Sequence, residues 1–361
     1  MPIEVEEFTL DDVVDTTTTI ANKMTIKEYK KIGEGAFGTV VEAKLKYYGH
    51  EWLGPFAIKR VPTQTEYKSR ELDILRLVNH PNIVKLRFYF NKQSGDKIYQ
   101  NLVMECLPLN LQEEIRYYRK SKYTIPYPHM KAYTWQLTRA MLYLHGFNIS
   151  HRDIKPSNIL IDPYTVSLKI CDFGSAKKLE SNQPSVSYIC SRYYRAPELI
   201  IGCSIYSTKI DIWGLGCVIA EMFLGRAIFQ GQSPELQLKE ISKLLGPPPN
   251  SFFFKSNPNY HGNMFTTKLF TCTVEERFAQ IFSNSPPDAI DLLLKILVYD
   301  PDLRASPRRV LVHPFFNELK SPDFVVIPRD SPTPIQLDLF DFSKLELDLL
   351  GPLKDEIYNF S

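Results

Sequence analysis

The chain has 361 residues, of which 44% are hydrophobic and 23% are charged, with 43 Lys and Arg against 41 Asp and Glu. At about 100–200 residues per domain the length predicts two domains or one bilobal unit, and the composition excludes a disordered, collagen-like or coiled-coil chain. The net charge of +2 lacks the basic excess expected of a general nucleic-acid binder.

The first 24 residues hold six acids and a single Lys, with no Arg and no Ser, and we predict a mobile or loosely packed arm. From residue 25 to 107, short runs rich in Val, Ile, Tyr and Phe alternate with Gly and Pro, which predicts a strand-rich lobe. Within it, residues 65–78 carry apolar side chains at three-residue spacing, as on one face of a helix.

After residue 107 the periodicity becomes mostly helical, with Gly and Pro stops, and predicts a larger helical lobe over 108–320. The predicted fold class is therefore α+β and bilobal. Residues 321–361 form a C-terminal extension, in which the acidic, Leu-rich stretch 338–350 is a candidate docking helix.

A GEGAFG string at residues 33–38 lies between two strand-like runs. Its glycines allow the backbone to approach phosphates closely, because a Cβ there would collide with the ligand. A dinucleotide-binding fold would need a helix to follow, but residues 40–45 have a strand pattern. This context favours a lid over a nucleotide.

Lys59 lies within the apolar strand that contains Ala57, where an unpaired ammonium is costly. Glu71, on the helix of the small lobe, is its natural partner. The alternative is that Lys59 lies on a sheet edge and that Glu71 is a solvated helix charge.

The string HRDIKPSN at residues 151–158 supplies Asp153, a carboxylate that can accept a hydroxyl proton, and Asn158, an oxygen ligand for a cation. DFG follows at 172–174 and APE at 196–198. With the glycine-rich loop and Lys59, these strings resemble, in order, the signature set of protein kinases over residues 25–320.

The resemblance implies an ATP-dependent protein kinase, whose catalysis depends on positioning and charge stabilisation. Asp153 would accept or orient the substrate hydroxyl, and Lys155 would offset charge at the γ-phosphate. Lys59, oriented by Glu71, would hold the α- and β-phosphates. Mg²⁺ would be held by Asn158 and Asp172. The other implied nucleotide contacts are Ile32, Gly33, Gly35, Gly38, Val40, Ala57, Met104, Glu105, Leu107, Leu160 and Cys171.

The resemblance also implies two structural roles: Asp211 braces the catalytic loop, and Arg304 pairs with Glu198. A nucleotide-binding scaffold without phosphoryl transfer is an alternative. The presence of Lys59, Asp153 and Asp172 argues against it.

The string SRYYRAPE at 191–198 is similar to the cyclin-dependent/MAP/glycogen-synthase/Clk group. SREL at 69–72 and NHPNIVKLR at 79–87 resemble glycogen synthase kinase-3, the shaggy family. No Thr occurs between residues 172 and 198. Tyr188 in this loop resembles the family's self-phosphorylated activating tyrosine; the alternative is an aromatic side chain that packs the loop down.

The family resemblance places Arg70, Arg152 and Lys177 together as an anion pocket. Related kinases order this loop by binding a phosphothreonine to basic residues. Without a Thr, the three cations need an external anion, and a phosphate on the substrate can supply it. We predict a Ser/Thr kinase that favours a phosphoserine or phosphothreonine four residues C-terminal to its target. The alternatives are ordinary surface bases and a Pro-directed kinase without priming dependence.

We expect protein substrates, preferentially phosphorylated beforehand, and neither nucleic acid nor membrane as partners. A scaffold groove is predicted over residues 234–273, with Leu238 pointing outward. The N-terminal residues lack the family's inhibitory Arg–Ser motif, so deleting residues 1–24 is expected to leave activity unchanged. Six Cys without a CxxC pair and the absence of an apolar signal region predict an intracellular, cytoplasmic protein that also has access to the nucleus.

Overall fold

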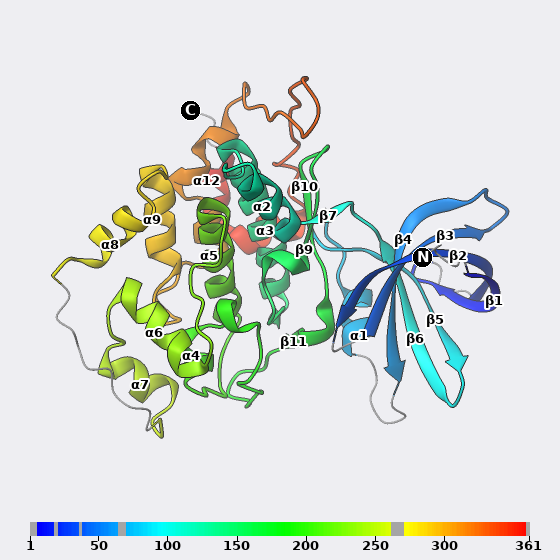
Figure 1. Cartoon of the computed structure of the whole chain (residues 1–361), viewed down its shortest axis with the longest axis horizontal. Helices are drawn as coiled ribbons and strands as arrows, with labels where there is room; N and C mark the ends of the chain where they lie inside the picture. Colours follow the sequence, from blue (N-terminus) through cyan, green and yellow to red (C-terminus); the bar gives the residue numbers. More distant parts are fainter. Residues whose placement is uncertain (1–5, 18–20, 36–37, 64–69, 261–270, 359–361) are drawn as a thin grey trace. The chain divides into compact units, whose positions relative to one another are not determined.

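The computed structural model describes residues 6–17, 21–35, 38–63, 70–260 and 271–358 (Figure 1). The chain divides into two compact units, residues 1–108 and 109–361, and each is described by itself. The predicted lobe boundary at residues 107 and 108 differs from this division by one residue.

Unit 1 is a closed antiparallel barrel with strand order β1-β2-β3-β4-β6-β5 (Figure 1). The barrel closes through two residue pairs between β1 and β5, and closure reduces the exposed sheet edge. Apolar side chains from alternate positions fill the interior, with Ile26, Ile58 and Val103 fully buried. The elements are β1 (Glu6–Asp15), β2 (Ala21–Gly35), β3 (Gly38–Tyr47), β4 (Leu53–Thr63), α1 (Arg70–Leu77), β5 (Leu86–Ser94) and β6 (Lys97–Glu105).

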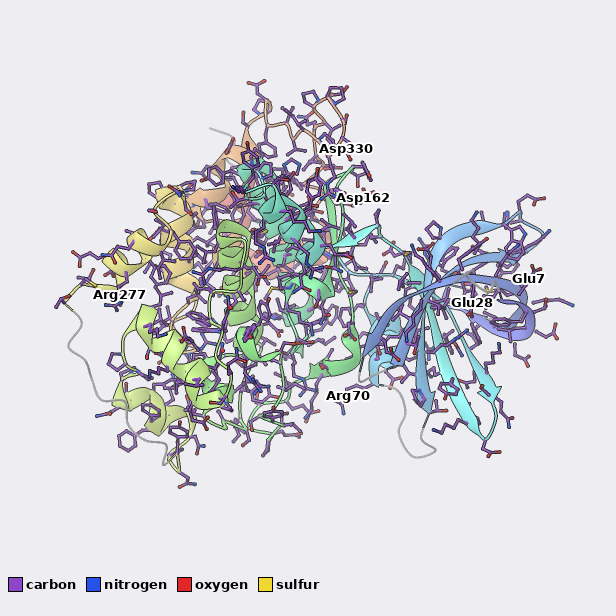
Figure 2. All side chains as sticks on the ribbon, viewed as in Figure 1. Glu7, Glu28, Arg70, Asp162, Arg277 and Asp330 are labelled. Atoms are coloured by element: carbon purple, nitrogen blue, oxygen red, sulfur yellow. The ribbon has the colours of Figure 1, made fainter. Side chains whose placement is uncertain are left out.

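The N-terminal segment is part of this barrel, so the prediction of a mobile or loosely packed arm is wrong for residues 6–15. β1 pairs with β2 on both sides of a bulge between Leu10 and Val13, and it closes the barrel by pairing Val14 with Tyr89 of β5. Val13 is fully buried in the core, and Glu7, labelled in Figure 2, lies opposite Lys27. Removing residues 1–24 would therefore open the barrel, and unchanged activity is no longer expected.

Unit 2 is mostly helical and is built around α3 and α5, whose side chains are buried over most of their length. α5 ends at Gly225, which has a φ of 66°, a conformation that glycine adopts without steric cost. Among the described residues, no helix is long and apolar enough to cross a membrane. The helices are α2 (Leu111–Lys120), α3 (Tyr127–Gly146), α4 (Pro197–Ile200), α5 (Lys209–Leu224), α6 (Pro234–Leu245), α7 (Asn250–Ser256), α8 (Val274–Ile281), α9 (Pro287–Ile296), α10 (Pro307–Leu311), α11 (Lys344–Leu350) and α12 (Lys354–Tyr358).

Short strands in unit 2 carry the segments with the kinase signature strings. β9 (Ile159–Asp162) pairs with β10 (Ser167–Ile170) and with β7 (Leu109–Asn110). β8 (Ile149–Ser150) pairs with β11 (Lys177–Lys178). These pairings bring residues 150–158 and 171–178 together.

The C-terminal extension packs on its own unit. Arg139 of α3 is 2% exposed, and its Nε donates to Glu346 of α11 over 2.9 Å. A Cβ at Gly146 of α3 would lie 2.6 Å from Leu349, so the two helices approach closely there. The candidate docking helix is thus shorter than predicted, and its buried face already has an internal partner.

The prediction that Leu238 points outward is wrong, because this side chain is fully buried while Leu236 is 45% exposed. Helical spacing identifies an apolar face but not which residue lies at its centre. Residues 261–270 of the predicted scaffold groove lie outside the described residues, and scaffold binding stays a prediction.

Candidate active site

In unit 1, the predicted ion pair between Lys59 and Glu71 is present. Lys59 Nζ lies 2.7 Å from each carboxylate oxygen of Glu71, and both side chains are buried. β4 supplies the lysine and α1 the glutamate. The pairing offsets much of the cost of removing both charges from water, whereas one partner left unpaired would be strongly destabilising.

The glycine-rich segment is a hairpin in which Gly33 pairs with Val40 and Gly35 pairs with Gly38. Gly38 has a φ of 134°, and a Cβ at this position would lie 1.9 Å from the carbonyl oxygen of Arg60. Only glycine can therefore occupy it. Residues 36 and 37 lie outside the described residues.

Strand register brings several predicted nucleotide contacts together in unit 1. Val40 lies opposite Lys59 on β4, and Ala57 lies opposite the buried Met104 on β6. Glu105 follows, and its Oε1 accepts a 2.7 Å hydrogen bond from the Lys85 N–H. Ile32, just before the hairpin, is exposed, and Leu107, near the end of the unit, is half-buried.

In unit 2, the Asp153 carboxylate is held from two sides. Its Oδ1 accepts the Ser191 N–H over 2.9 Å, and its Oδ2 lies 2.7 Å from Lys155 Nζ and accepts a 3.0 Å bond from Asn158 Nδ2. Lys155 also donates to Ser191 Oγ over 2.9 Å. These four residues form one hydrogen-bonded cluster.

This cluster keeps Asp153 ionised. Burial disfavours the charged carboxylate, but the hydrogen bond and positive charge of Lys155, with the two bonds from Ser191, outweigh burial and hold the pKa of Asp153 below its usual range. The carboxylate is therefore charged at neutral pH.

Asp211, at the start of α5, braces the catalytic loop as predicted. Its carboxylate accepts the main-chain N–H groups of His151 and Arg152 over 2.9 and 2.8 Å, and Ser150 Oγ donates to it over 2.9 Å. Burial opposes its ionisation, but hydrogen bonds and charge from His145 and the loop lower its pKa. Arg152 has a φ of 65°, a conformation that these bonds help to hold.

The segment with Asp172 is joined to the catalytic loop by main-chain bonds. The Cys171 N–H donates to the Asn158 carbonyl oxygen over 3.0 Å, and the Cys171 carbonyl oxygen lies 2.9 Å from His151 Nε2. Asp172 itself has a φ of 62°. Both predicted cation ligands, Asn158 and Asp172, thus lie at this junction, and the half-buried Leu160 follows on β9.

The charged side chains of Arg152 and Lys177 form hydrogen bonds with uncharged groups. Arg152 is 4% exposed, and its guanidinium donates to the Ser175 carbonyl oxygen over 2.6 Å and to Tyr206 Oη over 3.1 Å. Lys177 Nζ donates to Ser185 Oγ over 2.8 Å. Within the described residues neither side chain pairs with a carboxylate. Arg70, the third predicted member, begins α1 of unit 1 and is exposed (Figure 2).

The segment before APE is held by arginines. Tyr188 is 69% exposed, and the Arg195 guanidinium lies 4.3 Å above its ring. Arg195 also donates to the carbonyl oxygens of Ile189 and Cys190. The predicted pair between Arg304 and Glu198 is confirmed by two bonds of 2.7 and 2.6 Å, buried beneath this segment.

Three hydroxyl residues were not predicted: Ser191, Ser185 and Tyr206. Each contacts a predicted site residue that lies between 8 and 54 positions away in the sequence. A hydroxyl residue has no periodic or charge signature, so no sequence signal pointed to them.

Comparison with known proteins gives consistent matches. The family model for the protein kinase domain matches residues 26–316. Protein kinase MCK1 of Saccharomyces cerevisiae is 59% identical over 97% of this chain and 94% of its own length. The glycogen synthase kinase-3 homolog YGK3 of the same yeast is 41% identical over 99% and 94%. Glycogen synthase kinase 1 of Pyricularia oryzae is 41% identical over 97% and 88%.

Proposed function

The chain belongs to the protein kinase family and, within it, to the group like glycogen synthase kinase-3, and we propose that it is a priming-dependent kinase. It would transfer the γ-phosphoryl group of Mg·ATP to a Ser or Thr four residues before a phosphoserine or phosphothreonine. The observation that carries the priming step is the pair of uncompensated cations, Arg152 and Lys177.

The residues present fit a nucleotide-bound magnesium ion. Asn158 Nδ2 donates to the main-chain and side-chain oxygens of Asp153, so the amide oxygen is the atom that a cation can take. Asp172 adds a carboxylate. Mg²⁺ bound with a nucleotide usually takes one or two carboxylates together with phosphate oxygens. Within the described residues no group of three or more His, Cys, Asp or Glu is placed to hold a metal ion.

Asn158 and Asp172 would hold Mg²⁺, which would help to neutralise the negative charge that develops on the transferred phosphoryl group. The chain's own residues do the rest. Asp153 is fixed by Ser191 and Lys155, so it can accept a hydrogen bond from the substrate hydroxyl in one orientation. Because its pKa is lowered, the carboxylate is ionised at neutral pH and can orient the hydroxyl and accept its proton. Lys155 places a positive charge beside it.

In this proposal, residues of unit 1 bind the phosphates of ATP. Lys59, fixed by both oxygens of Glu71, presents one oriented ammonium to the α- and β-phosphates. The hairpin at residues 33–38, where Gly38 tolerates no Cβ, covers the phosphates with main chain.

The proposed preference for primed substrate rests on the charges of Arg152 and Lys177. A buried guanidinium bonded to neutral acceptors is a poorly compensated charge, and Lys177 Nζ contacts only a hydroxyl among the described residues. A phosphate of charge about −1.5 to −2 would compensate both. Two charge-assisted hydrogen bonds, discounted for solvent, would contribute roughly 3 kcal/mol, or about a 100-fold preference for primed substrate.

The test is phosphate transfer from Mg·ATP to two peptides that differ in one group, Ser-x-x-x-phosphoserine and Ser-x-x-x-Ser. The Asp172→Ala protein is the control for catalysis. The proposal expects transfer mainly to the primed peptide. Equal transfer to both would favour the Pro-directed alternative, and no transfer with nucleotide still bound would favour a scaffold.

Tyr188 is proposed as a self-phosphorylated tyrosine. Its side chain is exposed, which supports a modifiable tyrosine, although the Arg195 guanidinium over its ring is also a contact that packs the loop. Phosphopeptide mapping of freshly made protein tests this proposal, and an unmodified Tyr188 in fully active enzyme would refute it.

A further inference from the structure

Ser185 lies beside one of the two uncompensated cations. Its Oγ accepts a 2.8 Å hydrogen bond from Lys177 Nζ, and its main-chain N–H donates to the Ser204 carbonyl oxygen over 2.7 Å. The side chain is half-buried, and the four residues before it are exposed. The hydroxyl is therefore fixed in place at the edge of an exposed loop.

Tyr206 connects Ser185 to the second cation. Its hydroxyl accepts a 3.1 Å hydrogen bond from the Arg152 guanidinium and donates to the carbonyl oxygen of Val186, the residue after Ser185, over 2.8 Å. Lys177, Ser185, Tyr206 and Arg152 all lie within unit 2. A group added to Ser185 Oγ would have Lys177 on one side and the tyrosine-bound Arg152 on the other.

We propose that Ser185 is a phosphorylation site whose phosphate binds the chain's own Arg152 and Lys177. The loop has no Thr for such a role, but Ser185 already contacts the ammonium that an activating phosphate would pair with. The inference rests on the proposed function, because it assigns an internal occupant to the proposed priming pocket.

The modification is an ordinary phosphoryl transfer by a protein kinase acting on this chain. The bond between the γ-phosphorus of ATP and its bridging oxygen breaks, ADP leaves, and Ser185 Oγ forms the new P–O bond and loses its proton. The product carries about −1.5 to −2 charges and three acceptor oxygens. It would replace the single neutral contact at Lys177 with charge-assisted bonds.

Two consequences follow for the enzyme. The internal phosphate excludes the phosphate of a primed substrate from the same cations. It also ties the loop to residues 152 and 177, as an activating phosphate does in other switches of this kind. Phosphorylation of Ser185 therefore lowers the preference for primed substrate while activity on unprimed substrate is retained.

Ser187 is the matched control. It lies two residues further along the same loop and is also half-buried, but in the described part of the chain its side chain contacts no cation. The full chain is made with phosphoserine at position 185 or at position 187, and each protein is titrated by ³¹P NMR. Phosphoserine at 185 is expected to titrate about one pH unit or more below phosphoserine at 187. Lys177→Ala should reduce this difference.

Transfer to the primed and unprimed peptides is measured on the same proteins. The ratio of the two kcat/KM values should fall by about tenfold or more with phosphoserine at 185 and stay unchanged with phosphoserine at 187. If the two phosphates titrate at the same pH and the ratio of kcat/KM values does not change, the inference is overturned, while the proposed function still stands. A shifted titration at 185 in an enzyme that shows no primed preference before modification supports the docked phosphate and overturns the priming proposal.

Discussion

Lys155 Nζ lies 2.7 Å from Asp153 Oδ2, so the proposed catalytic carboxylate carries its own counter-ion two residues away. The same ammonium reaches Ser191 Oγ, which joins the catalytic loop to the segment before APE. One lysine therefore contributes both to the charge state of Asp153 and to the position of that segment.

Replacing this lysine should change the pH dependence of the reaction. In the native protein the pKa of Asp153 is below its usual range, so the carboxylate loses its charge only in acid, and no activity loss from this group is expected between pH 5 and 8. In Lys155→Ala, burial is less opposed and raises the pKa. The acid limb of kcat/KM should then move up by about one pH unit or more, in addition to a lower kcat. A profile whose acid limb does not move would contradict this role of Lys155.

Variants of the buried Lys59–Glu71 pair in unit 1 should affect the stability of the protein and its activity differently. Glu71→Ala removes the carboxylate bonded to the buried Lys59 ammonium, and should lower the free energy of unfolding by about 3–5 kcal/mol. The double variant Lys59→Met, Glu71→Leu has no buried charge to compensate, so it should recover most of that stability but no phosphoryl transfer. Denaturant unfolding and peptide phosphorylation measure the two effects. Recovery of activity in the double variant would refute the phosphate role of Lys59.

Asp211 should act on the rate through the main chain of the catalytic loop. Asp211→Asn keeps the size of the side chain but turns an amide NH₂ toward one of the N–H groups of His151 and Arg152. The resulting shift of the loop should lower kcat by about 100-fold, with nucleotide binding retained. Thermal unfolding shows whether the variant is folded, and a folded variant with native kcat would show that the brace does not position Asp153.

Much of this site could be predicted from sequence because its charges belong to ordered strings. The pairs Lys59–Glu71 and Arg304–Glu198 were predicted, as was the bracing role of Asp211. The Lys59–Glu71 pair follows from the cost of an unpaired ammonium in an apolar strand, whereas the Arg304–Glu198 pair and the role of Asp211 were implied by the resemblance to protein kinases.

Other features of the structure could not be predicted from sequence patterns. β1 contains Phe8, Leu10 and Val13 among acids, and a bulge between Leu10 and Val13 breaks the alternation that marks a strand. The contacts of Ser185 and Tyr206 depend on how separate loops meet, which local patterns do not determine. The burial of Leu238 depends on neighbours that only the folded unit supplies.

The C-terminal extension is predicted to stabilise unit 2 through one buried charge. Glu346→Ala removes the buried partner of Arg139 and should lower the free energy of unfolding by about 3–5 kcal/mol. Asp341 also contacts Arg139, over 2.5 Å, but is 47% exposed, and Asp341→Ala should cost about 1 kcal/mol or less. Denaturant unfolding compares the two variants, and equal losses would show that burial does not determine the strength of these pairs.

The most direct test of the priming account compares two neighbouring lysines of β11. Lys177 contacts Ser185 in the proposed pocket, whereas Lys178 is exposed. The ratio of kcat/KM for the primed peptide to that for the unprimed peptide is measured for Lys177→Ala and Lys178→Ala. The account predicts a fall of about tenfold for Lys177→Ala, with unprimed activity retained, and no change for Lys178→Ala. A ratio that stays at the native value in Lys177→Ala, or that falls equally in both variants, would contradict it.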